Sequence, residues 1–118
     1  MNRALILVAL LAGCSVQSQP PAAPSHSVEV LSVSCDPNHG RARAEVAVRN
    51  NGQTTIEWPK AMISFGGVVT SSHLRPNPLR PGGMATATAY AERGNGSSSC
   101  QLVGVQDGDG YSVNFFRQ

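Results

Sequence analysis

Residues 41–53 read Arg-Ala-Arg-Ala-Glu-Val-Ala-Val-Arg-Asn-Asn-Gly-Gln. From Arg41 to Asn50, apolar residues at the even positions alternate with mainly charged residues at the odd positions. This two-residue period predicts a β-strand with one buried and one solvated face. The Asn51-Gly52 dipeptide that follows accepts the positive φ angles of a type I′ turn. We therefore expect a hairpin here and an antiparallel β fold around it.

The rest of the chain after residue 27 has the same character, because short runs rich in β-branched residues alternate with turn-forming residues. No segment after the first 13 residues has the 3.6-residue apolar period of a helix over 11 residues. Further strands are expected at residues 28–35, 54–58, 61–65, 68–71, 84–91, 100–105 and 111–116. The last two are expected to form a hairpin. Seven or eight short strands predict an all-β sandwich or small barrel.

Two turn motifs resemble a known group of domains. A strand followed by Asn50-Asn51-Gly52, and Leu79-Arg80-Pro81-Gly82 before another strand, is similar to the small bacterial immunoglobulin-like families called FxLYD and CARDB. The resemblance covers roughly residues 41–91. It implies an immunoglobulin-like β-sandwich of about seven strands over residues 28–118.

The chain also departs from true immunoglobulin domains. Cys35 lies before the strand that would carry the first cysteine, and Ser98 stands where those domains place a corner tyrosine. The chain has six aromatic residues, so the core is expected to be thin. Trp58 is expected to be its central aromatic residue, with a surface binding role as the alternative.

The N-terminal residues form a separate unit. Arg3 is followed by nine apolar residues at positions 4–12, too few to cross a bilayer, which takes about 20. A charge followed by a short apolar run is typical of an export signal. Leu11-Ala12-Gly13-Cys14 resembles the lipobox of bacterial lipoproteins, which implies cleavage before Cys14 and a lipid on its thiol. The alternatives are a plain signal peptide with a chance cysteine and a buried N-terminal helix.

This reading divides the chain into three parts: a signal peptide over 1–13, a flexible tether over 14–27 that begins with the lipidated cysteine, and one domain over 28–118. The tether is rich in proline and serine, and His26 within it is expected to be solvated. Two or more acyl chains hold a soluble domain stably on a membrane. The resemblance further implies, for a Gram-negative source, that Ser15 directs the protein to the outer membrane, where it faces the periplasm.

Two cysteines, Cys35 and Cys100, remain once Cys14 is assigned to lipid. Exported domains meet oxidising conditions, so we expect a disulfide, with free thiols or metal ligands as the alternative. A loop of 65 residues closed in this way stabilises by about 4 kcal/mol in the chain-entropy model. Cys35 and His39 have a spacing that zinc ligands use, but a disulfide removes that site, so no metal and no cofactor are expected.

Charge and motifs exclude several functions. The formal net charge is +2, and +1 without residues 1–13, which argues against nucleic acid as the partner. The chain contains no nucleophile elbow, P-loop or dinucleotide fingerprint, and we expect no enzyme. Asp107-Gly108-Asp109-Gly110 lacks the further oxygen ligands of a calcium loop and is interpreted as a tight turn.

The sequence therefore predicts a lipid-anchored cell-envelope protein whose non-catalytic domain acts as an interaction or assembly module for another envelope protein. The alternatives are a periplasmic inhibitor of a hydrolase such as lysozyme and a small-ligand binding lipoprotein. The proline-bearing loop 73–81 is the candidate contact region, since functional surfaces favour loops on a rigid scaffold. Its candidate contact residues are His73, Leu74 and Leu79. A solvated connector is the alternative for this loop.

The lipobox interpretation predicts the covalent state of the mature protein. Chain purified from native membranes is expected to begin at Cys14 and to carry the mass of at least two acyl chains. Intact-mass spectrometry checks this, and Cys14→Ser is expected to abolish both the processing and the added mass. A freely soluble mature chain whose cysteine is bare or removed would contradict the interpretation.

Overall fold

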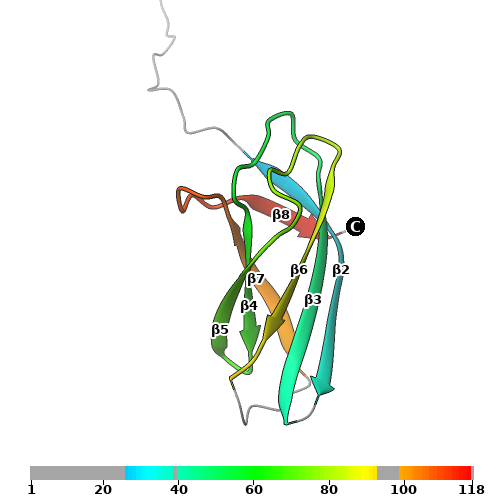
Figure 1. Ribbon diagram of the computed structural model, residues 1–118, viewed down its shortest axis with the longest axis vertical. Coiled ribbons are helices and arrows are strands. Elements are labelled where there is room, and N and C mark those ends of the chain that lie inside the picture. Colours follow the sequence, from blue (N-terminus) through cyan, green and yellow to red (C-terminus); the bar gives the residue numbers. More distant parts are fainter. Residues whose placement is uncertain (1–25, 39, 93–98, 118) are drawn as a thin grey trace, which may run out of the picture.

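The computed structural model describes residues 26–38, 40–92 and 99–117, which form a two-layer β-sandwich (Figure 1). The strands are β2 (Ser27–Asn38), β3 (Arg41–Asn50), β4 (Lys60–Phe65), β5 (Val68–His73), β6 (Met84–Tyr90), β7 (Cys100–Gln106) and β8 (Asn114–Arg117). One sheet has the order β6-β3-β2-β8 and the other β5-β4-β7. The predicted all-β sandwich class is confirmed. In the described ranges, no helix has the length and apolar character to span a membrane.

The first long hairpin, β2 with β3, contains a bulge that decides which side chains face the core. The register shifts between Val30 and Ser32, so Leu31 is the extra residue. The sequence alone predicts that Leu31, Val33 and Cys35 share one face. In the structure Val30 is buried before the bulge, and Val33 and Cys35 face the core after it. A bulge shifts the alternation of inward and outward side chains by one residue. Apolar side chains before and after the bulge can therefore both face the core.

The hairpin predicted at Asn51-Gly52 is wrong, because the chain crosses there to the other sheet. Gly52 lacks the positive φ of a type I′ turn. Its N–H instead donates to the side-chain oxygen of Asn50 at 2.9 Å, the local bond by which asparagine closes a turn. The tight hairpin lies one strand later, where Gly66 and Gly67 have φ of 58° and 96° and join β4 to β5.

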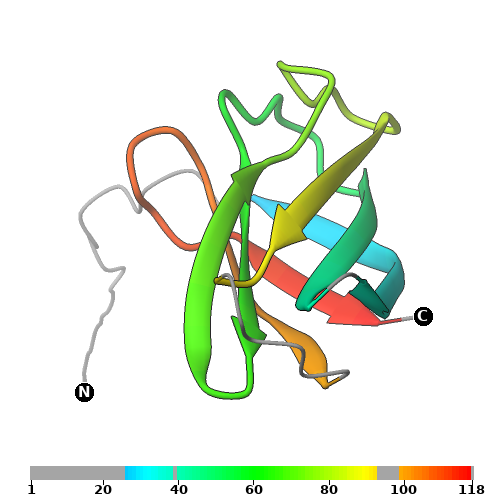
Figure 2. The ribbon, with the colours of Figure 1, turned by 60° about the horizontal axis from the view of Figure 1, so that its bottom comes forward.

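The hairpin predicted between residues 100–105 and 111–116 forms only at its closed end, where Gln106 and Ser112 make a single antiparallel bridge. β7 pairs with β4, whereas β8 crosses to the other sheet and runs parallel to β2 (Figure 2). Val113 is buried, and its N–H donates to the carbonyl of Val105 at 2.7 Å. At Val113 the chain passes over the end of the core, and β8 then pairs at the edge of the four-stranded sheet.

The core is built largely from small side chains. Of the nineteen buried hydrophobic residues in the described ranges, seven are alanine and Phe65 is the one aromatic. Several of the alanines lie where β3 pairs with β6, for example Ala44 opposite Ala89. Each alanine removes less apolar surface from water than a leucine or phenylalanine would. The core is therefore thin, as predicted. Cross-links between the sheets contribute a correspondingly larger share of the stability.

In the described residues, a disulfide and a side-chain hydrogen bond each link a strand of one sheet to a strand of the other. The predicted disulfide between Cys35 and Cys100 is present and connects β2 to β7. A loop closed over 65 residues contributes about 4 kcal/mol, comparable to the total of about 5–15 kcal/mol that such domains have. On the opposite side, the hydroxyl of Ser72 donates to the carbonyl of Thr88 at 2.8 Å and ties β5 to β6.

Asn50, the last residue of β3, connects the loops at one end of the sandwich and is completely buried. Its amide nitrogen donates to the carbonyls of Thr54 (2.8 Å) and Leu79 (3.0 Å), and its side-chain oxygen accepts from Gly52. Its backbone also exchanges hydrogen bonds with residues 82–83. A buried polar group is tolerated when all its partners are in place. One side chain thus holds the β3–β4 connection against the β5–β6 connection.

Replacing Asn50 by alanine is expected to lower the free energy of unfolding by about 3 kcal/mol, because it strands the Thr54 and Leu79 carbonyls and the Gly52 N–H. Urea denaturation of the full chain measures this. Asn51→Ala, at the exposed neighbouring position, is the matched control and is expected to stay within about 0.5 kcal/mol of the unsubstituted chain. Equal stability of the two variants would contradict the role assigned to Asn50.

Candidate functional site

Three connections and the start of β2 meet at one end of the sandwich, at the top of Figure 1. They are the β3–β4 connection over residues 51–59, the β5–β6 connection over residues 74–83 and the β7–β8 connection over residues 107–113. The first two are joined by paired hydrogen bonds between Ile56 and Leu79, both 2.9 Å. The result is a fixed platform on which side chains from distant parts of the sequence lie together.

Trp58 is the most unusual residue of this platform. Its backbone has a φ of 51°, a left-handed conformation that bulky residues rarely adopt, and its side chain is 57% exposed. The backbone N–H donates to the side-chain oxygen of Asn77 at 2.6 Å, and the indole meets the ring of His73 edge-on at 6.4 Å. Residues in such conformations cost about 1–3 kcal/mol and cluster at functional sites. The prediction that Trp58 is the central core aromatic is wrong, since Phe65 is the buried aromatic residue.

Asp107 organises the neighbouring turn. One carboxylate oxygen accepts hydrogen bonds from the backbone N–H groups of Asp109 (2.9 Å) and Tyr111 (3.0 Å). The other oxygen lies 3.8 Å from Nε2 of His26, and the two side chains are only 10% and 12% exposed. These bonds to the backbone are those of an aspartate that closes a turn. The interpretation of residues 107–110 as a tight turn is therefore confirmed.

His26 is not a solvated tether residue, contrary to the sequence-based prediction. Besides facing Asp107, its Nδ1 is hydrogen-bonded to the hydroxyl of Thr54 at 2.9 Å, and its carbonyl accepts from the N–H of Asn114 at 3.0 Å. The ordered domain therefore begins at least two residues before position 28. These contacts attach the start of β2 to the platform.

Gly108 lets two of the connections touch. Its N–H donates to the carbonyl of Glu57 at 2.8 Å. A Cβ atom added at this position would lie 3.0 Å from Cβ of Trp58 and 3.1 Å from the Glu57 carbonyl oxygen, closer than ordinary contacts allow. Glycine is the residue that permits such a close approach of backbones. The 107–113 connection is thereby fixed beside Trp58.

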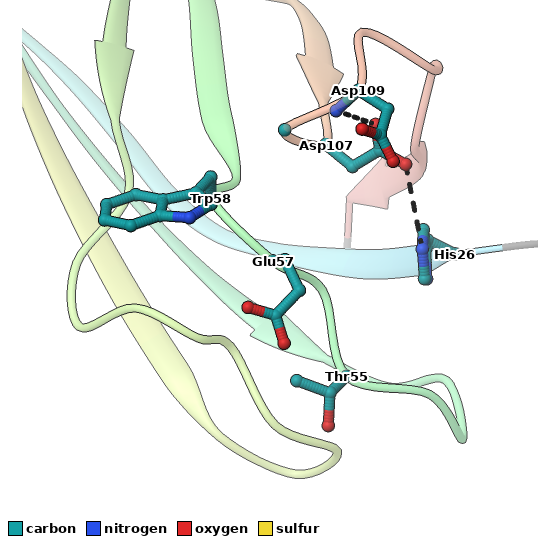
Figure 3. Close-up of a pocket in the computed structure, with 7 residues that line it drawn as sticks. His26, Thr55, Glu57, Trp58, Asp107 and Asp109 are labelled. Carbon is teal, nitrogen blue, oxygen red and sulfur yellow. Dashed lines mark hydrogen bonds and ion pairs between the residues drawn. The ribbon is translucent and has the colours of Figure 1, made fainter.

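These residues enclose a cavity of about 170 Å³, lined by His26, Thr55, Glu57, Trp58, Asp107, Gly108 and Asp109 (Figure 3). In the figure the Glu57 carboxylate lies between Trp58 and Thr55, whereas the Asp107 carboxylate turns to His26. Within the described ranges, neither Glu57 nor Asp109 forms an ion pair, and both are exposed. The cavity therefore combines an aromatic wall with two uncompensated negative charges.

The cavity does not have the geometry of a nucleophilic triad, although Thr54, His26 and Asp107 supply a hydroxyl, an imidazole and a carboxylate. The 3.8 Å separation of Asp107 and His26 exceeds a hydrogen bond, so the carboxylate does not orient the imidazole as a triad requires. Among the described residues, no group of three or more His, Cys, Asp and Glu side chains is placed to hold a metal ion.

The predicted contact loop lies at this end, but two of its three candidate residues are not on the surface. Leu74 and Leu79 are each 1% exposed and belong to the core, so the prediction that they contact a partner is wrong. Backbone hydrogen bonds attach Leu74 to Pro59 and Leu79 to Ile56. His73 is exposed and lies against Trp58, so it remains available for contact.

The other predicted site residues lie elsewhere. The Cys35–Cys100 disulfide links the last part of β2 to the first residue of β7, and its formation leaves Cys35 unable to serve as a metal thiolate. Cys14 and His39 lie outside the described residues, so the lipid anchor stays a prediction. Sequence reasoning missed Glu57 and Asp109 as cavity residues, because nothing local indicates that their two connections meet.

Comparison with known proteins adds little. No known protein family and no curated protein matches the chain. Among solved structures, the chain is similar to IrmA from Escherichia coli, with a TM-score of 0.48 and 10% sequence identity, over 80% of this chain and 91% of that one. A likeness of this degree carries no inference about function. The resemblance to the FxLYD and CARDB families stays a prediction from turn motifs.

The close approach at Gly108 predicts the effect of a single methyl group. Gly108→Ala is expected to displace Trp58, change its fluorescence emission maximum and lower stability by about 1–3 kcal/mol. Trp58 is the only tryptophan of the chain, so the emission reports on this residue alone. Gly104→Ala is the matched control, since its Cβ would meet Met62 at an ordinary 3.5 Å. An unchanged emission spectrum in Gly108→Ala would contradict the packing described.

Proposed function

We propose that this chain is a non-catalytic interaction module of the bacterial cell envelope, attached to a membrane through a lipid on Cys14, that binds another protein at the end of the sandwich around Trp58. In a Gram-negative source the membrane is the outer membrane and the domain faces the periplasm. The observation that carries the proposal is the exposed indole of Trp58, fixed in a left-handed backbone conformation by contacts with two neighbouring connections. Tryptophan is among the residues that dominate the binding energy of protein interfaces.

The surface next to Trp58 supports a protein partner. The outer face of the β5-β4-β7 sheet leads to Trp58 through His73, which pairs with Lys60. Lys60 is the one lysine, arginine, aspartate or glutamate in these three strands, and Val69 and Val103 are exposed on them. Interface centres are depleted in charge in the same way.

The opposite surface carries more charged residues, and it also exposes Met84 and Tyr90. The outer face of the β6-β3-β2-β8 sheet carries ion pairs between Arg43 and both Asp36 and Glu45, and between Arg49 and Glu29. Its charges compensate one another, which is typical of a solvated face. The asymmetry between the two sheets favours the Trp58 side as the contact surface.

The alternative functions find less support. The cavity beside Trp58 is smaller than typical small-molecule sites of about 300–1,000 Å³, which disfavours a small-molecule ligand at this end of the sandwich. No feature of the described residues favours inhibition of a hydrolase over binding to an assembly partner.

A crosslinking experiment tests the proposed contact surface. A photoreactive amino acid in place of the exposed His73 in the full, membrane-attached chain is expected to form a defined adduct with one envelope protein in intact cells of the source bacterium. Adding Trp58→Ala is expected to reduce that adduct at least about tenfold, in line with the loss of an interface hot spot.

Tyr90→Ala, which removes an exposed aromatic residue from the outer face of the other sheet, is the matched control and is expected to leave the adduct unchanged. Circular dichroism checks that both variants fold. An adduct that Trp58→Ala and Tyr90→Ala leave equally intact would reject the proposed surface.

A further inference from the structure

Three carboxylates line the cavity beside Trp58, and the fold uses only one of them. Asp107 is buried, closes its own turn and faces His26. The Glu57 and Asp109 side chains are exposed, and within the described residues no hydrogen bond or ion pair engages either carboxylate. Their charges therefore contribute nothing evident to the stability of the domain. They are available to a ligand.

The aromatic wall of the cavity points to the same ligand chemistry. Trp58 has the side chain whose ring attracts a cation most strongly, and more than half of its surface is open to solvent. An aromatic face together with two free carboxylates attracts an ammonium or guanidinium group and disfavours an anion. Trp58 and Glu57 come from the 51–59 connection and Asp109 comes from the 107–113 connection, and the Gly108 contact holds the two connections together.

The size of the cavity limits the ligand to a single group. About 170 Å³ is below the range of sites that enclose whole small molecules, which start near 300 Å³. One extended side chain with a charged end suits a cavity of this size. The alkyl part of lysine or arginine can lie along an apolar surface while its charge reaches polar groups at the rim.

We propose that the cavity beside Trp58 accepts one lysine or arginine side chain of the protein partner, with its cation at Glu57 and Asp109 and its stem along the indole. The inference rests on the proposed function and specifies the chemistry that the partner presents. The cavity walls are joined by the Gly108 to Glu57 hydrogen bond before any ligand arrives. Such preorganisation reduces the ordering that binding requires.

A fluorescence titration tests the ligand class directly. The full chain in non-ionic detergent is titrated with the capped peptides acetyl-Gly-Lys-Gly-amide and acetyl-Gly-Arg-Gly-amide while the emission of Trp58, the only tryptophan, is recorded. Both peptides are expected to give a saturable change that weakens in 0.5 M NaCl, because salt screens exposed charges. Acetyl-Gly-norleucine-Gly-amide, which keeps an alkyl stem without the charge, is expected to give none.

The two carboxylates are tested by neutral replacement. Glu57→Gln with Asp109→Asn is expected to weaken lysine-peptide binding about tenfold, the effect of losing two charge contacts at a partly exposed site. Glu45→Gln with Glu92→Gln makes the same change in net charge away from the cavity and is expected to leave the affinity unchanged. Equal responses to the lysine and norleucine peptides, or no response to any cationic peptide, would overturn the inference. So would saturable binding of the neutral sugar N,N′-diacetylchitobiose that the double replacement leaves unaltered.

The crosslinking experiment with a photoreactive amino acid at position 73 distinguishes a failure of this inference from a failure of the proposed function. Loss of the adduct in Trp58→Ala, together with its loss in the double carboxylate variant, supports both. Loss in Trp58→Ala alone keeps the proposed contact surface and rejects the basic side chain as its ligand. An adduct unchanged in both variants rejects the contact surface itself.

Discussion

The buried side-chain amide of Asn50 is the interaction on which one whole end of this sandwich depends. Through Thr54 it holds the segment whose hydroxyl bonds to His26, and through Leu79 it holds the segment that pairs with Ile56. Because Glu57 and Trp58 directly follow Ile56, the bonds of Asn50 help to place one wall of the cavity. A core containing seven alanines leaves little apolar burial to do the same work, so hydrogen bonds position these loops instead.

Local patterns predict the strands of this protein well but not their partners. The strands expected at residues 41–50, 61–65 and 84–91 each rest on a pattern contained within a few residues, and each is confirmed. The strand expected at residues 54–58 is reduced to an isolated bridge between Ile56 and Leu79. Which strands pair with one another depends, in contrast, on residues far apart in the chain. Asn51-Gly52 has the local preference of a hairpin turn, yet the side chain of the residue before it captures the Gly52 N–H and redirects the chain.

The sequence predicts where the candidate site lies but not which residues form it. The loop after β5 does lie at the site, but Leu74 and Leu79 point inward, because two leucines in a proline-rich loop are the groups best able to cap the end of a core. No local signal reveals the exposure of Trp58, since a residue before proline is expected to be extended rather than left-handed. Its conformation is imposed by Asn77 and by the close approach of Gly108, both distant in sequence.

The parallel pairing of β2 with β8 makes neighbours of the first and last strands that the structure describes. Contacts of such large sequence separation raise the contact order of the domain, and folding slows as contact order rises. The four-stranded sheet cannot be completed until β8 has been synthesised, however early β2 and β3 have paired. For a chain that crosses a membrane as an extended polypeptide, this topology delays closure of the sandwich until almost the entire domain has passed through.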